Sequence, residues 1–252
     1  MKMMKMFYLL VLCRLREFRR EPSAIFFVVF FPLVLMTVIY FIFDFSAGDK
    51  GDRVIDFIVP GLLAFSIFTT CLFGLGMTFV THRREQLLKR YLMTPMPTFV
   101  YILSHLVGRQ LIMLVEMVVI MGCAMVLFDF SFKGSIWLFL VLCSLGTAMM
   151  SFFALVLASR TIQTSFYNGL ANLILLPLML LGEVWRPLEN LPYWLQMVSE
   201  YSPLTPLVTS VRDVASSGAT VTDVLPRIVI MAVYTVVFAL LGHRLFVWYS
   251  HK

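Results

Sequence analysis

Three ionisable side chains stand inside an apolar stretch near the middle of the chain. His105, Arg109 and Glu116 lie within residues 99–128. Spacings of four and seven residues place all three on roughly one face of a helix. At mid-membrane each charge would cost roughly 2.5–3.5 kcal/mol, so such residues usually face protein or water. They could form the centre of a lipid-modifying enzyme, or Glu116 could carry protons for a gradient-driven carrier.

The same stretch also allows a plainer interpretation. If the span starts late, His105 and Arg109 sit at the membrane interface and only Glu116 is buried, because 111–128 is nearly long enough to cross alone. Asn168 and Asn172 lie four residues apart in a later apolar run. We expect them to hydrogen-bond a neighbouring helix, with substrate contact as the second interpretation.

The familiar motifs of soluble catalysis are absent from the sequence. It has no Gly-x-x-x-x-Gly-Lys-[Ser/Thr] loop for nucleotide phosphates, no His-Glu-x-x-His and no Gly-x-Ser-x-Gly. The histidines show no ligand spacing, and the four cysteines include no CxxC pair. We therefore predict no catalytic residue, no metal and no cofactor bound by this chain.

The composition indicates a membrane protein. Hydrophobic residues make up 60% of the 252 positions and charged residues 13%, whereas soluble domains average about half and a quarter. A chain this short cannot hide that excess in a core. The net charge of +6 lies between apolar runs rather than on a basic helix, so we exclude a nucleic-acid partner.

Six apolar stretches are long enough to cross a bilayer, which takes about 20 residues. They cover 24–43, 54–80, a part of 99–128, 136–158, 166–184 and 228–248. The sequence thus predicts an all-α integral membrane fold with six transmembrane helices in one domain, 1–252. That domain has an N-terminal segment over 1–23, a six-span bundle over 24–248 and a tail over 249–252.

The basic residues set an orientation. Thirteen Lys and Arg residues fall on the side of the termini and six on the other, with Arg109 left inside a span. Because cytoplasmic connections carry the excess of Lys and Arg, we place both termini in the cytoplasm.

Three segments do not span. Residues 4–20, apolar and then arginine-rich, predict a helix in the cytoplasmic interface, or a plain basic anchor that sets topology. Residues 81–97 predict a short amphipathic helix closed by Pro95 and Pro97, which is either a simple loop or a docking surface for a cytoplasmic partner. Residues 191–201 and 204–214 predict two short interfacial or re-entrant helices before the sixth span, carrying Trp194 and Tyr201 at the outer interface.

These non-spanning segments carry a family resemblance. Arg84-Glu85 with Thr94-Pro95, and Leu191-Pro192 with Pro203-Leu204-Thr205 followed by Arg212, resemble the ABC-2 type transporter permease family across essentially the whole chain. A Gly-Thr pair commonly follows the family's Glu, whereas Gln86-Leu87 stand here. The resemblance therefore does not fix the turn after Glu85.

The resemblance implies the membrane subunit of an ABC exporter in a bacterial plasma membrane, with no ATPase activity of its own. Two copies, or this chain and a close paralogue, would form the pore, and two separate ATPase subunits would bind ATP and Mg²⁺. The segment over 81–97 would be the coupling helix that docks on the ATPase. Its expected contact residues are His82, Arg83, Arg84, Glu85, Leu88, Arg90, Thr94 and Pro95.

The resemblance also implies a route for the substrate. Two permeases would rock as the ATPases close, and an amphipathic drug, lipid or glycan-linked lipid would move outward along their interface. The outer helices over 191–214 would form an external gate. Candidate residues for the path or gate are Glu116, Arg109, Asn168, Asn172, Trp194 and Tyr201.

Overall fold

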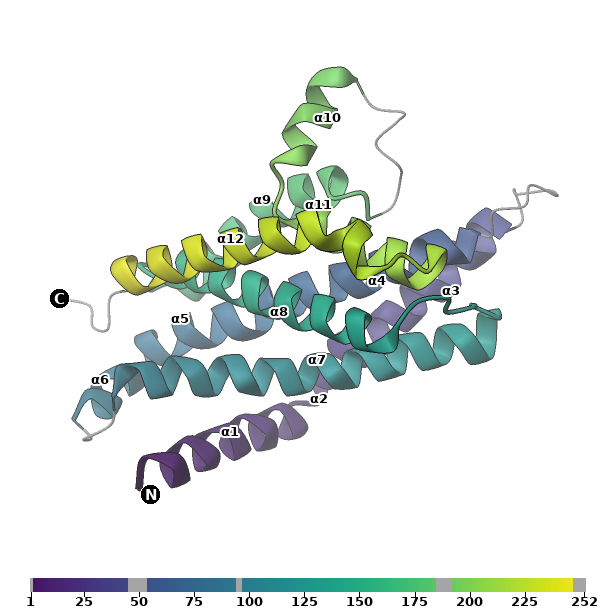
Figure 1. The fold of residues 1–252 in the computed structure, drawn as a ribbon. Coiled ribbons are helices and arrows are strands. Elements are labelled where there is room, and N and C mark those ends of the chain that lie inside the picture. Colours follow the sequence, from purple (N-terminus) through teal and green to yellow (C-terminus); the bar gives the residue numbers. More distant parts are fainter. Residues whose placement is uncertain (1, 45–53, 94–96, 185–191, 247–252) are drawn as a thin grey trace.

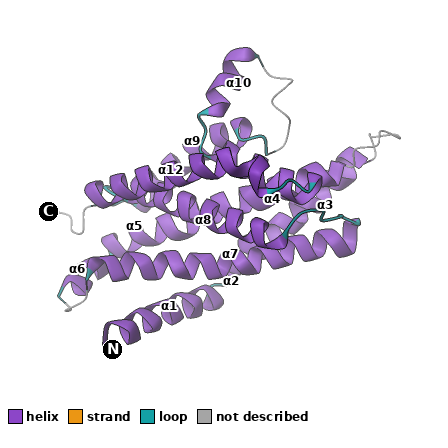
Figure 2. Ribbon diagram, in the orientation of Figure 1, coloured by secondary structure: helices purple, strands orange, loops and turns teal. Residues whose placement is uncertain are grey.

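The structure is a computed structural model that describes residues 2–44, 54–93, 97–184 and 192–246. Every regular element in these ranges is helical, and most of the helices run side by side (Figure 2). In chain order they are α1 (Lys2–Arg20), α2 (Pro22–Ile25), the π-helical η1 (Phe26–Phe30), α3 (Phe31–Asp44), α4 (Val54–Thr69), the π-helical η2 (Thr70–Gly76), α5 (Met77–Arg84), α6 (Leu87–Leu92), α7 (Thr98–Phe128), α8 (Ile136–Ala158), α9 (Thr164–Leu181), α10 (Tyr193–Glu200), α11 (Leu204–Arg212), the π-helical η4 (Asp213–Ser217) and α12 (Val221–Leu245).

Within the described residues, five helices are long and apolar enough to cross a membrane, so the chain is a multi-pass membrane protein. They cover Ile55–Arg84, Phe99–Phe128, Ile136–Ala158, Thr164–Leu181 and Val221–Leu245. The first predicted span coincides with α2, η1 and α3, which follow one another without a break. Only the shorter stretch Phe31–Phe41 of that run stands out as an apolar helix. A sixth crossing therefore stays a prediction.

The second span, built from α4, η2 and α5, forms the centre of the bundle. Its apolar stretch is 78% buried, compared with 11% for α9 and for α12. Leu63 and Phe68 are fully enclosed there, and α7, α8 and α11 pack around it. Figure 1 shows α1 on one side of the bundle and α12 with α10 on the opposite side. The chain itself thus covers most of one span and leaves two largely open.

The two predicted outer helices form but differ in environment. Most of α11 is buried among α4, α8 and α12, with Leu204, Leu207 and Val208 fully enclosed. In contrast, α10 stands away from the bundle (Figure 1), and Trp194 on it and Tyr201 directly after it are exposed. The helix α11 is therefore part of the bundle's core, whereas α10 presents its aromatic side chains outward.

Two predicted boundaries are wrong. The last span begins at Val221 rather than 228, because Thr220 and Asp223 form a capping box that starts the helix before Pro226. The second span continues past residue 80 to Arg84, since no helix breaker intervenes. The predicted amphipathic helix over 81–97 is accordingly split into the end of α5, a turn at Glu85 and Gln86, and the short α6.

Candidate functional site

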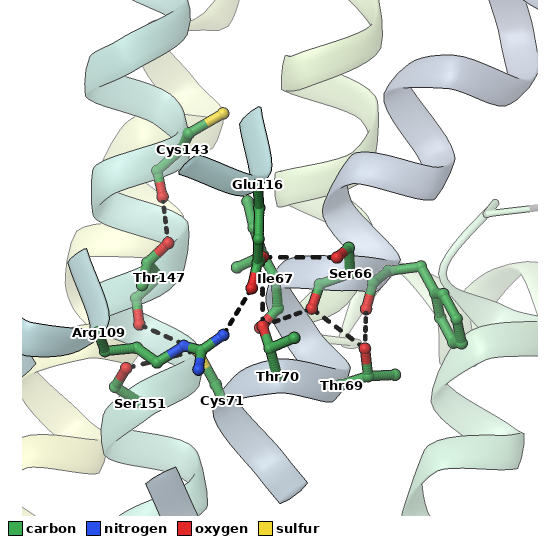
Figure 3. Close-up of polar contacts among 11 residues, drawn as sticks. Ser66, Ile67, Thr69, Thr70, Cys71, Arg109, Glu116, Cys143, Thr147 and Ser151 are labelled. Carbon is green, nitrogen blue, oxygen red and sulfur yellow. Dashed lines mark hydrogen bonds and ion pairs between the residues drawn. The ribbon is translucent and has the colours of Figure 1, made fainter. Parts of the chain in front are cut away.

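Arg109 and Glu116 form a buried ion pair on α7 (Figure 3). The Arg109 Nη2 atom donates to Oε1 of Glu116 at 2.7 Å, and the Glu116 side chain is completely buried. Seven residues are about two helical turns, so both side chains leave the same side of α7. Each charge compensates the other where either alone would be strongly destabilising. The predicted shared face of Arg109 and Glu116 is therefore confirmed.

The second span supplies further polar groups to this pair. The hydroxyls of Ser66 and Thr70 lie 3.4 and 3.3 Å from Oε2 of Glu116. Thr70 has one proton to share between Glu116 and the Ser66 carbonyl, which lies 2.6 Å away. The contact lies about 18 Å from the C-terminal end of α7, judged from its twelve remaining residues. It is a polar junction between two spans, deep in the bundle.

The π-helical segment η2 wraps the other side of Arg109. A Cβ atom at Gly74 would lie 3.0 Å from Arg109 Nη1, so the missing side chain leaves room for the guanidinium. Cys71, also on η2, lies 3.4 Å from the Ser151 hydroxyl of α8. Widened helical turns of this kind frequently occur at functional sites. We define the polar centre as Ser66, Thr70, Arg109 and Glu116.

His105 belongs to a different cluster, at the end of the bundle where α6 lies. Its ring lies 4.6 Å from the Tyr101 ring and 5.7 Å from the His82 ring. His82 Nδ1 and the Tyr101 hydroxyl are 2.6 Å apart, and Arg14 of α1 approaches His82 Nε2 at 3.5 Å. The structure thus brings Arg109 and Glu116 together but places His105 with these aromatic and basic neighbours. Arg14 is buried there, so this arginine of the predicted interfacial helix packs within the bundle.

The charged segment after the second span divides into exposed and buried residues. Arg84, Glu85 and Arg90 are exposed. Leu88 is fully buried, and Arg83 donates to the carbonyls of Ala158 and Thr161 at 2.6 Å each. Thr94 and Pro95 lie outside the described residues. The three exposed residues form a surface that is accessible to a partner. The buried residues His82, Arg83 and Leu88 attach the segment to the bundle.

The turn that joins α5 to α6 depends on Gln86. Its backbone is left-handed, with φ at 59°, which ends α5 and redirects the chain into α6. Glycine, which has no Cβ atom, adopts this conformation without steric cost, whereas the Cβ atom of an L-residue makes it unfavourable. The resemblance noted above has Gly at this position. Gln86 therefore takes the backbone conformation for which glycine is best suited.

The other candidate path or gate residues lie apart from the polar centre. Asn168 and Asn172 are exposed on α9, Trp194 is exposed on α10, and Tyr201 is exposed directly after it. The carbonyl of Tyr201 accepts from the Tyr234 hydroxyl of α12 at 2.8 Å. No single site thus joins all six candidates within the described residues.

Arg212 is a structural link for which sequence reasoning had assigned no contact. Its guanidinium lies 3.6 Å from the centre of the Phe57 ring and donates to the Glu183 carbonyl at 2.5 Å. Burial lowers the pKa of Arg212 to about 10, against the opposing effect of the Glu183 carboxylate. Arg212 therefore stays charged at neutral pH and joins α11 to α4 and to the end of α9. The sequence offers one signal for this contact: Arg212 is the single charged residue of α11.

Comparison with known proteins identifies the family of this chain. The model of the ABC-2 type transporter family matches residues 6–215. The chain belongs to the ABC-2 type transporter family. It is 28% identical over 190 residues to the inner membrane transport permease YadH of Escherichia coli, covering 72% of each chain. It is 23% identical over 234 residues to the daunorubicin resistance ABC transporter permease protein DrrB1 of Streptomyces coeruleorubidus, covering 91% of this chain and 81% of that one.

As a member of this family with relatives named as transport permeases, the chain is a permease subunit of an ABC transporter. The matched region includes the polar centre, the exposed turn at Glu85 and the buried helix α11. The resemblance seen in the sequence is therefore confirmed at the level of the family.

Proposed function

We propose that this ABC-2 permease is the membrane subunit of an ATP-driven exporter, in which a separate ATPase subunit binds ATP and Mg²⁺. Two permease copies form the pathway, and an amphipathic substrate moves outward along their interface. Both termini lie in the cytoplasm of a bacterial cell. The start of α1, α6 and the end of α12 lie at one end of the bundle (Figure 1), and the helices that begin or end there carry Arg83, Arg84, Lys89, Arg90 and Arg244. Such a group of Lys and Arg residues favours the cytoplasmic side.

The exposed turn between α5 and α6 carries this proposal. It presents Arg84, Glu85 and Arg90 outside the bundle, in a chain without a nucleotide-binding loop of its own. A compact charged turn of this kind suits a groove on a cytoplasmic partner, where charged contacts fix register and specificity. We therefore assign direct ATPase contact to these three residues. His82, Arg83 and Leu88 would act as anchors that transmit force to the bundle.

A continuous path leads from that turn to the polar centre. The second span is one helical run, Ile55–Arg84, so a push at Glu85 acts along the helix that carries Ser66 and Thr70. Arg83 also holds the end of α8 and lies 4.9 Å from the Phe246 ring, just beyond α12. A displacement of the turn would thus move three spans together, as rigid packed elements do.

The substrate class is proposed from the composition and from a relative. The chain contains 24 Phe and 17 Met residues, which suit an adaptable apolar path. The relative DrrB1 is named for daunorubicin resistance. We propose an amphipathic drug, a lipid or a glycan-linked lipid on this basis.

A charge swap at the turn tests the function. Arg84→Glu combined with Glu85→Arg should reduce ATP-dependent transport by more than about tenfold, because reversed charges meet the unchanged partner. Membrane insertion should be normal, since both side chains are exposed. Arg244→Glu, an exposed change at the same end of the bundle, is the matched control and should transport normally.

The same assay separates the competing functions. Normal transport by the swapped protein would overturn the coupling role of this turn. Activity of the purified chain without nucleotide would instead indicate a lipid-modifying enzyme. Flux that follows a proton gradient and ignores vanadate would indicate a carrier that uses Glu116.

A further inference from the structure

A widened helical turn lies between the polar centre and the charged turn at Glu85. The π-helical η2 begins at Thr70, which contacts Glu116, and leads directly into α5. Backbone hydrogen bonds span four residues in an α-helix and five in a π-helix, so a π-helical turn takes up one residue more. Because one residue corresponds to about 100° around an α-helix, conversion of η2 to an α-helix would rotate α5 by about that angle. The direction of the charged turn therefore depends on η2 keeping its wide form.

Tyr167 of α9 reaches into this widened turn. Its side chain is fully buried, and its hydroxyl donates to the Leu72 carbonyl of η2 at 2.8 Å. Inside a membrane, backbone groups that a local π-helical adjustment frees are satisfied by neighbouring helices and side chains. A buried carbonyl without such a partner is costly. The bond from Tyr167 therefore favours the wide form of η2 over an α-helical one.

The shape of η2 fits the large side chains on both sides of it. A Cβ atom at Gly76 would overlap the Tyr167 hydroxyl, and one at Gly74 would lie 3.0 Å from Arg109 Nη1. Residues two positions apart lie on roughly opposite sides of a helix, so α7 and α9 enclose η2 between them. A shift of the chain by one residue would bring the large side chains before the glycines, Phe and Leu, to these two places. The present rotation is thus the one in which Tyr167 and Arg109 both fit.

We propose that Tyr167 is a positioning residue for transport: by donating to the Leu72 carbonyl it holds η2 wide and so sets the rotation of α5 and of the charged turn. It acts through η2 and not by contact with the ATPase, because it is enclosed in the bundle. The inference rests on the proposed function for the task of the charged turn.

Removing the hydroxyl tests this role. Tyr167→Phe keeps the ring but leaves the Leu72 carbonyl without its donor, so transport per ATP hydrolysed should fall by about fivefold, with a normal amount of protein in the membrane. Tyr234→Phe is the matched control and should couple normally. The Tyr234 hydroxyl also donates to a backbone carbonyl, that of Tyr201, but it does not touch the second span. Normal coupling in Tyr167→Phe, or an equal loss in the control, would overturn the inference.

Shortening η2 separates a positioning role from a stabilising one. Deletion of Phe73, a half-buried residue of η2, removes the additional residue, so an α-helical second span then keeps α5 in its present rotation. Alone, the deletion should impair transport, because the Tyr167 hydroxyl stays buried while its acceptor bonds within its own helix. Combined with Tyr167→Phe, it should restore transport to within about twofold of the unaltered protein, since neither the donor nor the wide form is then needed. If the hydroxyl only stabilises the fold, the combined variant is instead the worst of the three, and this result would contradict the inference.

Melting temperatures of the purified permease provide a readout that needs no ATPase. The combined variant should melt above either single variant, because the two changes compensate each other. If it does so while the charge swap at Arg84 and Glu85 leaves transport normal, Tyr167 still sets the rotation of α5 and only the coupling role of the turn is lost. If the charge swap abolishes transport but the two changes lower the melting temperature additively, the proposed function stands and the role of Tyr167 fails.

Discussion

At the scale of single residues, Glu116 is a fully buried acidic group with polar partners on two spans. It is completely enclosed and faces Arg109, Ser66 and Thr70 from two different helices. Both of its carboxylate oxygens accept hydrogen bonds from these groups. Glu116 therefore joins α7 to the second span. The same pairing explains why α7 can carry two charges without exposing either of them to lipid.

This constraint predicts a non-additive pair of substitutions. Arg109→Met or Glu116→Leu alone should lower the free energy of unfolding by about 3–5 kcal/mol, because each leaves an uncompensated buried charge. The double variant should cost much less than the sum, since it removes both charges. Reversible unfolding in detergent measures all three. Additive losses would contradict a direct pairing in the folded membrane protein.

At the scale of elements, the turn between α5 and α6 decides how the charged segment is presented. The segment is one continuous amphipathic pattern in the sequence, yet Gln86 breaks it with a left-handed residue. Leu88 then packs inward while Arg90 stays exposed. The orientation of the proposed ATPase contact therefore depends on a single backbone conformation.

Gln86→Gly should accordingly stabilise the protein by about 0.5–1 kcal/mol. Glycine removes the roughly 1–2 kcal/mol penalty of a left-handed L-residue, and its greater freedom in the unfolded chain returns part of that gain. Met93→Gly is the control, because Met93 is also exposed but has φ at −77° and should lose stability. A thermal shift measured for both variants checks the pair. A destabilised Gln86→Gly would argue against this turn.

The elements were predictable wherever hydrophobicity alone determines them. Five of the predicted spans coincide with long apolar helices. The reason is that an apolar run inside a membrane has no water to bond, and a helix satisfies all of its backbone hydrogen bonds internally. The π-helical segment η2 was not foreseen, since its residues are as apolar as the α-helical ones beside it. Nor could spacing separate His105 from Arg109, because only the packing of α5 and α1 shows which neighbour each side chain meets.

At the scale of the whole molecule, burial decreases outward from the second span. That span is enclosed by its neighbours, and α11 packs on its N-terminal end, where Arg212 stacks on Phe57 of α4. The spans α9 and α12 are held on one side and left open on the other. Such an arrangement leaves the outer surfaces for lipid and a partner, while the enclosed span connects the exposed turn to the polar centre.

The orientation of the molecule can be checked with a cysteine that it already contains. Cys13 is exposed on α1, whereas Cys71 and Cys143 are buried. If the basic side is cytoplasmic, a membrane-impermeant maleimide should leave Cys13 unlabelled in intact cells and label it in inverted vesicles. Ser131→Cys in a Cys13→Ser background supplies the opposite probe, because Ser131 is exposed in the connection between α7 and α8. That connection lies at the end of the bundle away from α6 (Figure 1), so it should be labelled in intact cells. The reverse labelling of the two positions would place the charged turn outside the cell and exclude a cytoplasmic ATPase as its partner.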